Sequence, residues 1–366
     1  MQKASLYDID VLLVLWPFNA NAAIQQAGRG RISSMVSISM RNAIVFASFA
    51  LTTATASLNT RPAQAEEYPS RTIKIVVPYP AGGPTDLIGR AVADALQKAL
   101  AQSVIVENKP GAGGTIGTDS VAKSNPDGYT LLLGLMGPIS IAPKIATNLP
   151  YDPQKDLMPV RLVATMPEIL VARPSLGLQT LAAVVSYAKA HPGKLTIASA
   201  GNGSLPHLAA ELLKREANID VLHVPYRGAA PAANDLIGGQ VDLMFGDGPI
   251  VLPLIESKKL TPIIVASEKR LPVIPDVPTS AESGFASITS DNWYGVFVPK
   301  GTPQPILDKI DQATAKGLLN PRLEETFTKL GVYIAKDGTP DSFGKFLDAQ
   351  HKNWGTLAKD VGVKID

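Results

Sequence analysis

The chain has 366 residues, of which 45% are hydrophobic and 18% are charged, and this is enough apolar material for more than one hydrophobic core. Its 34 basic and 32 acidic residues leave a formal net charge of +2. A near-neutral chain without runs of Lys or Arg lacks the charge pattern of a nucleic-acid-binding protein. Cysteine is absent, which excludes disulfides, thiolate metal sites and cysteine nucleophiles.

The first predicted element is a secretory signal peptide at residues 40–65. Arg41 supplies a positive n-region, an apolar stretch follows at 43–51, and Ala-Gln-Ala at 63–65 has the small-x-small pattern of a cleavage site. The apolar stretch is too short for a comfortable membrane span. We therefore expect cleavage after Ala65 and export to the periplasm.

Residues 1–39 precede this signal and contain an apolar patch at 11–18. We interpret them as an over-extended start that is not part of the fold, with Met40 as the true initiator. A membrane anchor is the alternative interpretation.

Short β-branched runs then alternate with longer segments of helical periodicity, beginning with a strand at 72–78 and a helix at 86–100. This rhythm predicts an α/β protein with mainly parallel sheets covered by helices. The predicted strands are 72–78, 104–107, 130–134, 195–199, 221–224, 241–245 and 262–266, and the predicted helices include 86–100 and 116–124.

The mature length favours two lobes over a single sheet. Two extended segments without helical periodicity, 161–172 and 291–299, are the expected crossings, and each could run as a hinge strand between the lobes. Lobe 1 is then discontinuous, comprising 68–160 and 298–366, and lobe 2 comprises 161–297.

Ligands of open α/β sheets bind beyond the carboxyl ends of the strands, and the loop at 78–86 stands at such a place. Its glycines let the backbone approach a ligand closely, and the free N–H groups of a helix start form an anion site without any charged side chain. Asp86 has two interpretations, a helix cap or an acceptor facing the ligand. The candidate ligand-binding residues here are Pro80, Ala81, Gly82, Gly83 and Asp86.

The loop at 198–207 has the same form, with glycines and serines at a helix start. The hydroxyl groups of Ser199 and Ser204, together with neighbouring N–H groups, could wrap a second carboxylate. His207 is expected to pack or cap rather than to contact ligand. The candidate ligand-binding residues here are Ser199, Ala200, Gly201, Asn202, Gly203 and Ser204.

Two further loops follow predicted strands. Arg227, in the loop at 224–231, could pair with a carboxylate bidentately or lie in solvent. Asp247, in the Gly-Asp-Gly-Pro loop after Phe245, is the other candidate. About four or five charge-assisted donors of roughly 1.5–3 kcal/mol each would suffice for micromolar binding, so no arginine clamp is required.

Catalytic signatures are missing. The sequence contains no P-loop, no GxSxG elbow and no HExxH or HxxxH spacing, so we predict no catalytic residue, no cofactor and no metal. An enzyme, for example a hydrolase using Ser204 and His207, is the second hypothesis. A ligand-sensing subunit that reports to a membrane sensor kinase is the third.

Five motifs in order resemble the Bug-type proteins, the TctC receptors of tripartite tricarboxylate transporters: YPAGGPTDLIGR (79–90), VENKPGAGGTIG (106–117), PDGYTLLLG (126–134), ASAGNGSLPHLAAELLK (198–214) and VPYRGAAPAANDLIGGQVDLMF (224–245). The resemblance implies a periplasmic type II binding-protein fold of two hinged lobes. It also implies a monomer that closes on a carboxylate like a venus flytrap and delivers it to membrane transporter subunits.

The resemblance further implies that one loop from each lobe, Pro80–Gly83 with Asp86 and Ser199–Ser204, holds the carboxylate. The loops around Met136 and Asp247 depart from the family pattern, which leaves the ligand open among tricarboxylates, dicarboxylates, acidic amino acids, aromatic acids and nicotinate-like compounds. Tyr79 and Met136 suggest an apolar or aromatic ligand body.

Overall fold

The computed structural model describes residues 67–360, without the side chains of residue 353 and residues 355–360. The predicted signal peptide and the predicted over-extended start both lie outside the described residues. Within the described part, no helix combines the length and the apolar character needed to cross a membrane.

The strands form one mixed sheet in the order β2-β1-β3-β9-β4-β7-β5-β6, with β8 and β10 also paired to β4. Pairing is parallel at β1 with β2 and β3 and at β5 with β6 and β7, whereas β4 and β9 run antiparallel to their neighbours. The strands are β1 (Ile73–Val77), β2 (Val104–Asn108), β3 (Thr130–Leu135), β4 (Leu157–Ala172), β5 (Thr196–Ser199), β6 (Leu222–Pro225), β7 (Leu243–Asp247), β8 (Thr261–Val265), β9 (Asp291–Pro299) and β10 (Tyr333–Ile334).

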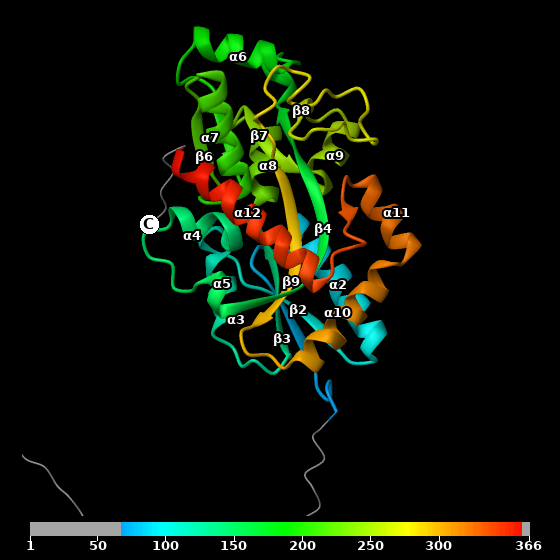
Figure 1. Cartoon of the computed structure of the whole chain (residues 1–366). Coiled ribbons are helices and arrows are strands. Elements are labelled where there is room, and N and C mark those ends of the chain that lie inside the picture. The colour runs from blue at the N-terminus through cyan, green and yellow to red at the C-terminus, as the bar shows by residue number, and fades with distance from the viewer. Residues whose placement is uncertain (1–66, 361–366) are drawn as a thin grey trace, which may run out of the picture. The chain divides into compact units, whose positions relative to one another are not determined.

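The helices flank this sheet (Figure 1). They are α2 (Pro84–Leu100), α3 (Thr115–Ala122), α4 (Ala142–Ile145), α5 (Pro153–Asp156), α6 (Leu181–Ala190), α7 (Leu205–Ala217), α8 (Ala229–Ile237), α9 (Gly248–Glu256), α10 (Gln304–Leu318), α11 (Pro321–Lys329) and α12 (Pro340–Asp360), with short helical turns at Ala112–Gly114, Gly137–Ile141 and Pro174–Leu176. The predicted α/β class is confirmed.

The 16-residue strand β4 joins the two parts of the sheet. Its first part, Leu157–Pro167, pairs with β9, and its last part, Glu168–Ala172, pairs with β7, and with β8 over most of its length. The change of partner therefore falls at Glu168. The segments predicted as crossings at 161–172 and 291–299 are both strands, and they pair with each other.

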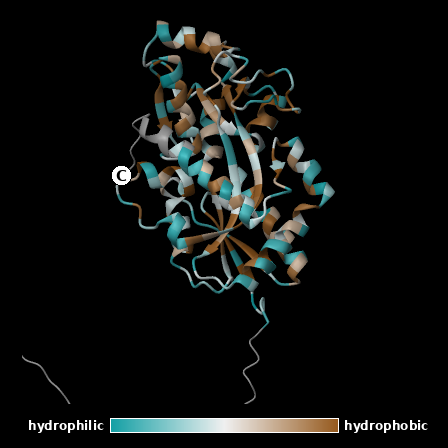
Figure 2. Ribbon diagram, viewed as in Figure 1, coloured by the Kyte–Doolittle hydropathy of each residue, from teal (hydrophilic) through white to brown (hydrophobic). Residues whose placement is uncertain are grey.

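Hydrophobic alternation explains the core. In β1, Ile73, Ile75 and Val77 are buried in one cluster, whereas Val76 packs into another on the opposite face, as expected for a strand covered on both faces. Burying a side chain of this kind contributes roughly 1.5–3 kcal/mol. Figure 2 shows the result, with brown strands in the interior and helices that carry teal residues outward.

The C-terminal helix α12 runs across β4 and β9 (Figure 1). The ring of Phe343 lies 5.7 Å from that of Trp293 and 5.2 Å from that of Phe297. Gly295 lies between these two residues, and an added Cβ there would stand 2.2 Å from the Phe343 ring. Only glycine lets the helix pack this closely onto β9.

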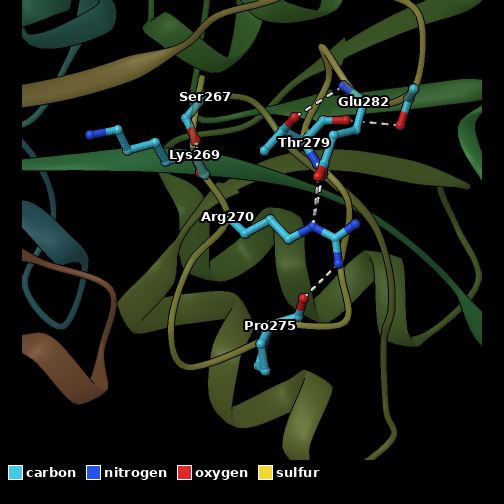
Figure 3. A network of polar contacts seen from close by, with 7 residues as sticks. Ser267, Lys269, Arg270, Pro275, Thr279 and Glu282 are labelled. Carbon is cyan, nitrogen blue, oxygen red and sulfur yellow. Dashed lines mark hydrogen bonds and ion pairs between the residues drawn. The ribbon is translucent and has the colours of Figure 1, made fainter.

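The loop between β8 and β9 is tied by its own side chains (Figure 3). The Arg270 guanidinium pairs with the Glu282 carboxylate at 2.8 Å and donates to the Pro275 carbonyl at 2.8 Å. Thr279 and Glu282 exchange side-chain-to-backbone hydrogen bonds in the manner of a capping box. These contacts fix the path of the chain into β9.

Candidate functional site

Loops at the carboxyl ends of the parallel strands enclose a cavity of about 100 Å³. It lies where the loops after β1, β5, β6 and β7 meet, as the general rule for open α/β sheets predicts. The lining residues are Tyr79, Pro80, Ala81, Gly83, Pro84, Thr85, Leu135, Gly137, Ala200, Ser204, Leu205, Pro206, Gly228, Ala229, Ala230, Pro231, Phe245, Gly246, Asp247, Asn292 and Tyr294.

Four helices, α2, α7, α8 and α9, begin at this cavity, and none has its first turn capped by its N-cap side chain. Elsewhere, α5, α6 and α11 are capped by Asp152, Thr180 and Asn320, whereas α4 and α10 also begin without a side-chain cap. An uncapped first turn leaves N–H groups and the positive end of the helix dipole available to an anion.

A wider hollow of about 610 Å³ adjoins the cavity. Tyr79, Pro80 and Ala200 line both spaces, whereas Asp247 and Asn292 line only the cavity. We name this hollow the mouth of the site, and Asp247 lies in the part of the cavity wall that it does not share.

Asp86 holds the loop at 78–86 in place through hydrogen bonds. Its carboxylate accepts hydrogen bonds from the Gly82 N–H at 3.0 Å, from Arg90 Nε at 2.9 Å and from Asn108 Nδ2 at 3.0 Å. Burial alone would raise the pKa of Asp86, but these hydrogen bonds outweigh it and hold the pKa below its ordinary value. Asp86 lines neither the cavity nor its mouth, and its bond to the Gly82 N–H holds the loop before α2 rather than capping the helix.

Internal hydrogen bonds also hold the second loop. Ser204 Oγ donates to the Gly201 carbonyl at 2.6 Å, and the Gly201 N–H donates to Ser199 Oγ at 3.2 Å. Ser199 is fully buried and lies outside the cavity lining, which Ser204 joins.

A pair of stacked histidines supports this loop. The rings of His207 and His223 lie 4.0 Å apart, the Gly203 N–H donates to His207 Nδ1 at 3.1 Å, and His223 Nε2 lies 2.7 Å from Ser199 Oγ. Burial lowers the pKa of both imidazoles to about 4, so both are neutral at pH 7. Since Nδ1 of His207 accepts a hydrogen bond, its proton is on Nε2.

The cavity wall contains Asp247, which is only 8% exposed. Tyr294 Oη donates to its Oδ2 at 3.2 Å, and Asn292 Nδ2 lies 3.4 and 3.5 Å from its two carboxylate oxygens. Burial raises the pKa of Asp247 to about 6, against hydrogen bonds that lower it. Asn292 and Tyr294 stand two positions apart on β9, so both side chains point to the cavity face.

The predicted site residues divide by position. Those that line the cavity or its mouth are Tyr79, Pro80, Ala81, Gly83, Ala200, Gly201, Asn202, Ser204, Arg227 and Asp247. Those that line neither are Gly82, Asp86, Met136, Ser199 and Gly203. Arg227 is exposed at the mouth.

Met136 requires a correction. Its side chain is fully buried in a core cluster with Val76 and Leu132, because the chain enters the helical turn Gly137–Ile141 directly after it and an apolar side chain is more stable in the core there. It does not contribute an apolar surface to the cavity.

Sequence reasoning missed several lining residues. Ala229–Pro231, at the start of α8, stand in a loop whose position already pointed to the site. Asn292 and Tyr294 carry no such signal, because they lie in the middle of a strand and reach the cavity only through the pairing of β9 with β4. Among the described residues, no cluster of His, Asp and Glu side chains is arranged to hold a metal.

This mixed sheet, with ligand-sized space at its strand ends, has the fold of solute-binding proteins. The structure of the periplasmic binding protein BugD superposes with a TM-score of 0.78 and 38% identity, over 81% of this chain and 99% of that one. Two Rhodopseudomonas palustris proteins are similar too: Rpa4515 with adipate (TM-score 0.78, 31% identity, 81% and 99% covered) and MatC with bound malate (TM-score 0.76, 34% identity, 80% and 100% covered).

The profile of the tripartite tricarboxylate transporter family receptor, TctC, matches residues 88–363. BugT of Bordetella pertussis is 36% identical over 305 residues, 83% of this chain and 93% of BugT. The chain therefore belongs to the TctC receptor family, whose members are solute-binding receptors and not enzymes. The resemblance inferred from the motifs and the prediction of a non-enzyme are confirmed.

Proposed function

We propose that this protein is a periplasmic receptor that binds a small carboxylate in the cavity and delivers it to the membrane subunits of a tripartite tricarboxylate-type transporter. The observation that carries the proposal is the convergence of uncapped helix starts, those of α2, α7 and α8, on one enclosed space. Two structural neighbours are described with adipate and with bound malate, so carboxylates are the ligand class of close structural relatives.

The magnitudes support this site. A helix start stabilises a nearby anion by about 0.3–1 kcal/mol, and by about 2 kcal/mol when partly buried. Each charge-assisted hydrogen bond adds roughly 1.5–3 kcal/mol. Three helix starts with a few N–H donors thus approach the 8 kcal/mol or so that corresponds to micromolar affinity.

We also propose that the lobes, 68–160 with 298–366 and 161–297, close on the ligand about the strands at 161–172 and 291–299. The cavity lining supports this, because Tyr79 to Thr85 come from the first lobe and Ala200 to Pro206 from the second. Small-angle X-ray scattering should show a smaller radius of gyration with a bound carboxylate than without it. An unchanged radius would contradict closure.

The carboxylate site is tested by adding a negative charge at a helix start. Ala230 is the second residue of α8 and lines the cavity, and Ala182 is the second residue of α6 and is exposed. An acid at either position favours its own helix, so both Ala230→Asp and Ala182→Asp should fold.

A thermal-shift screen of carboxylic acids, followed by calorimetry on the best binder, supplies the measurement. We expect Ala230→Asp to weaken carboxylate binding at least tenfold and Ala182→Asp to leave it unchanged. Equal affinity in wild type and Ala230→Asp would overturn the proposed site.

Delivery to a transporter is a separate claim. Cells without the receptor should lose uptake of the radiolabelled binder, and wild-type receptor should restore it. Unimpaired uptake in cells without the receptor would argue instead for the sensing role.

A further inference from the structure

The wall of the cavity carries an acid. Asp247 lines the cavity together with Asn292 and Tyr294, and none of the three lines the adjoining hollow. A carboxyl group in the wall does not strengthen the binding of an anion by the helix starts. Its presence therefore needs another physical reason.

The side chain of Asp247 is not used by its own helix. Asp247 is the N-cap residue of α9, a position where aspartate usually accepts a hydrogen bond from the first turn, yet it makes no such bond. Its partners are the hydroxyl of Tyr294 at 3.2 Å and the amide of Asn292 at 3.4 and 3.5 Å. These are long hydrogen bonds, and a carboxylate has about four acceptor positions, so capacity remains toward the cavity.

A second acid stands behind it. Glu168 of β4 lies directly opposite Asp247 of β7 in the antiparallel register, which puts both side chains on the same face of the sheet. Glu168 is fully buried, Ser290 Oγ donates to its Oε2 at 2.8 Å, and its Oε1 has no hydrogen-bond partner. Burial, and then the nearby Asp247, raise the pKa of Glu168 well above its ordinary value.

In the part of the chain that the structure describes, no basic side chain pairs with Asp247 or Glu168. The titratable groups facing them are Tyr79 after β1, and Asp291 and Tyr294 on β9, and neither acid forms an ion pair with Lys, Arg or His there. Buried carboxylates in proteins are normally paired with a cation. The cavity is the open side from which such a cation can come.

We propose that Asp247, backed by Glu168, makes the site selective for ligands that carry an ammonium group at the end remote from the carboxylate, so that the ligand is an amino carboxylate rather than a dicarboxylate. The inference rests on the proposed carboxylate site. The helix starts of α2, α7 and α8 hold the carboxylate, and Asp247 receives the ammonium group.

The cavity volume limits the size of this ligand. About 100 Å³ is well below the roughly 300–1,000 Å³ of pockets for drug-sized molecules, so only a short chain separates the two ends. A dicarboxylate of that length would bring its second carboxylate against Asp247, and like charges at contact in a low dielectric repel strongly. An ammonium group at the same place forms a charge-assisted hydrogen bond.

Matched ligands test the selectivity. β-Alanine, succinate and butyrate share a carboxylate and two methylenes and differ only in an ammonium, carboxylate or methyl end; γ-aminobutyrate, glutarate and pentanoate form the next longer set. By calorimetry at pH 7, we expect the amino acid of the better-fitting set to bind at least tenfold more tightly than its dicarboxylate.

Asp247→Asn should reduce this ratio to less than threefold. Asp276→Asn, the same substitution at an exposed residue outside the cavity lining, should keep the wild-type ratio. A dicarboxylate that binds wild type as tightly as its amino partner would overturn the inference while leaving the carboxylate site intact. Failure of every carboxylate to bind would overturn the proposed function and the inference together.

Proton linkage in the wild-type protein gives a second readout, which does not depend on the folding of a variant. An ammonium group favours the ionised form of Asp247, so binding of the amino acid near pH 6 should release protons. A dicarboxylate favours the protonated form and should take protons up. Titration in two buffers of different ionisation enthalpy measures the sign, and proton uptake with the amino acid would contradict the inference.

Discussion

Asp86 and Asp94 form a natural comparison at the scale of single residues, because each pairs with a basic residue four positions later on α2. Asp86 is buried and pairs with Arg90 at 2.9 Å, whereas Asp94 and Lys98 pair at 2.6 Å in solvent, with side chains more than half exposed. By distance alone, the Asp94–Lys98 pair would be the more stabilising of the two. Burial and the number of partners reverse that order, since surface pairs contribute only about 0–1 kcal/mol.

We expect Asp86→Asn to lower the free energy of unfolding by about 2 kcal/mol, because hydrogen bonds to a charged group contribute roughly 1.5–3 kcal/mol. The variant should also bind carboxylate more weakly, since one uncharged amide oxygen cannot serve Gly82, Arg90 and Asn108 as the carboxylate does, and the loop that lines the cavity is loosened. Denaturant unfolding and calorimetry measure the two effects. Asp94→Asn, the control, should change neither by more than experimental error, and equal losses in both variants would contradict the assigned role.

Asp86 should support both the stability of the fold and ligand binding. Asp247, by contrast, should lower stability while it contributes to binding. Its pKa in the folded protein is raised to about 6, above the ordinary value of 3.8, so its stabilising contribution is complete below about pH 4 and is lost as the pH rises through 6. At pH 8 the ionised, buried carboxylate therefore costs about 2–3 kcal/mol by the usual conversion of a pKa difference.

Asp247→Asn should accordingly melt a few degrees higher than wild type at pH 8, and the difference should vanish below pH 4. Melting curves at several pH values measure it. A variant that is less stable than wild type at pH 8 would indicate that the carboxylate serves the fold rather than the site.

The loops between elements set how closely the two sides of the cavity approach. Gly113, in the turn before α3, has a φ of +62°, and an added Cβ would lie 2.5 Å from the backbone oxygen of Asn202 in the loop before α7. Gly177 has a similar φ of +72° on the surface, with no heavy atom within 4 Å of such a Cβ. The two glycines share a conformation and differ only in what faces them.

Both Gly113→Ala and Gly177→Ala add the strain of a left-handed residue, about 1–2 kcal/mol, so both should be slightly less stable. Only Gly113→Ala separates the loop at 111–114 from the loop at 201–203. We expect it to weaken carboxylate binding at least fivefold, and Gly177→Ala to leave the dissociation constant unchanged. The same affinity in both variants would show that the contact at Gly113 is not needed in the bound state.

For the molecule as a whole, local patterns in the sequence predicted the α/β class and the loops that carry the cavity. Strand 72–78 and helix 86–100 were predicted within a few residues of β1 and α2, because alternation and helical periodicity are local properties. The antiparallel pairing of β8 and β9 with β4 was not predicted, since pairing depends on residues far apart in the chain.

The site divides in the same way. Glycine-rich loops such as Ala81–Gly83 can be recognised in the sequence as candidate binding loops. Asn292 and Tyr294 have no sequence feature that distinguishes them from other strand residues. Glu168 reads as part of an extended segment, and only the change of partner along β4 puts it opposite Asp247. The part of the site that depends on the pairing of distant strands could therefore not be predicted from the sequence. The part formed by single loops could be.

The alternation along β9 has a practical outcome for spectroscopy. Trp293 lies between Asn292 and Tyr294, so its indole points to the opposite face and packs against the rings of Phe343 and Phe346 of α12, with a buried Nε1 that has no hydrogen-bond partner. This chromophore cannot be quenched by direct contact with a molecule in the cavity, yet it belongs to the same strand. Trp354 of α12 also emits, so Trp354→Phe isolates Trp293 in the chain that begins after the predicted cleavage site. A change in the emission of this variant on titration would report a bend or shift of β9.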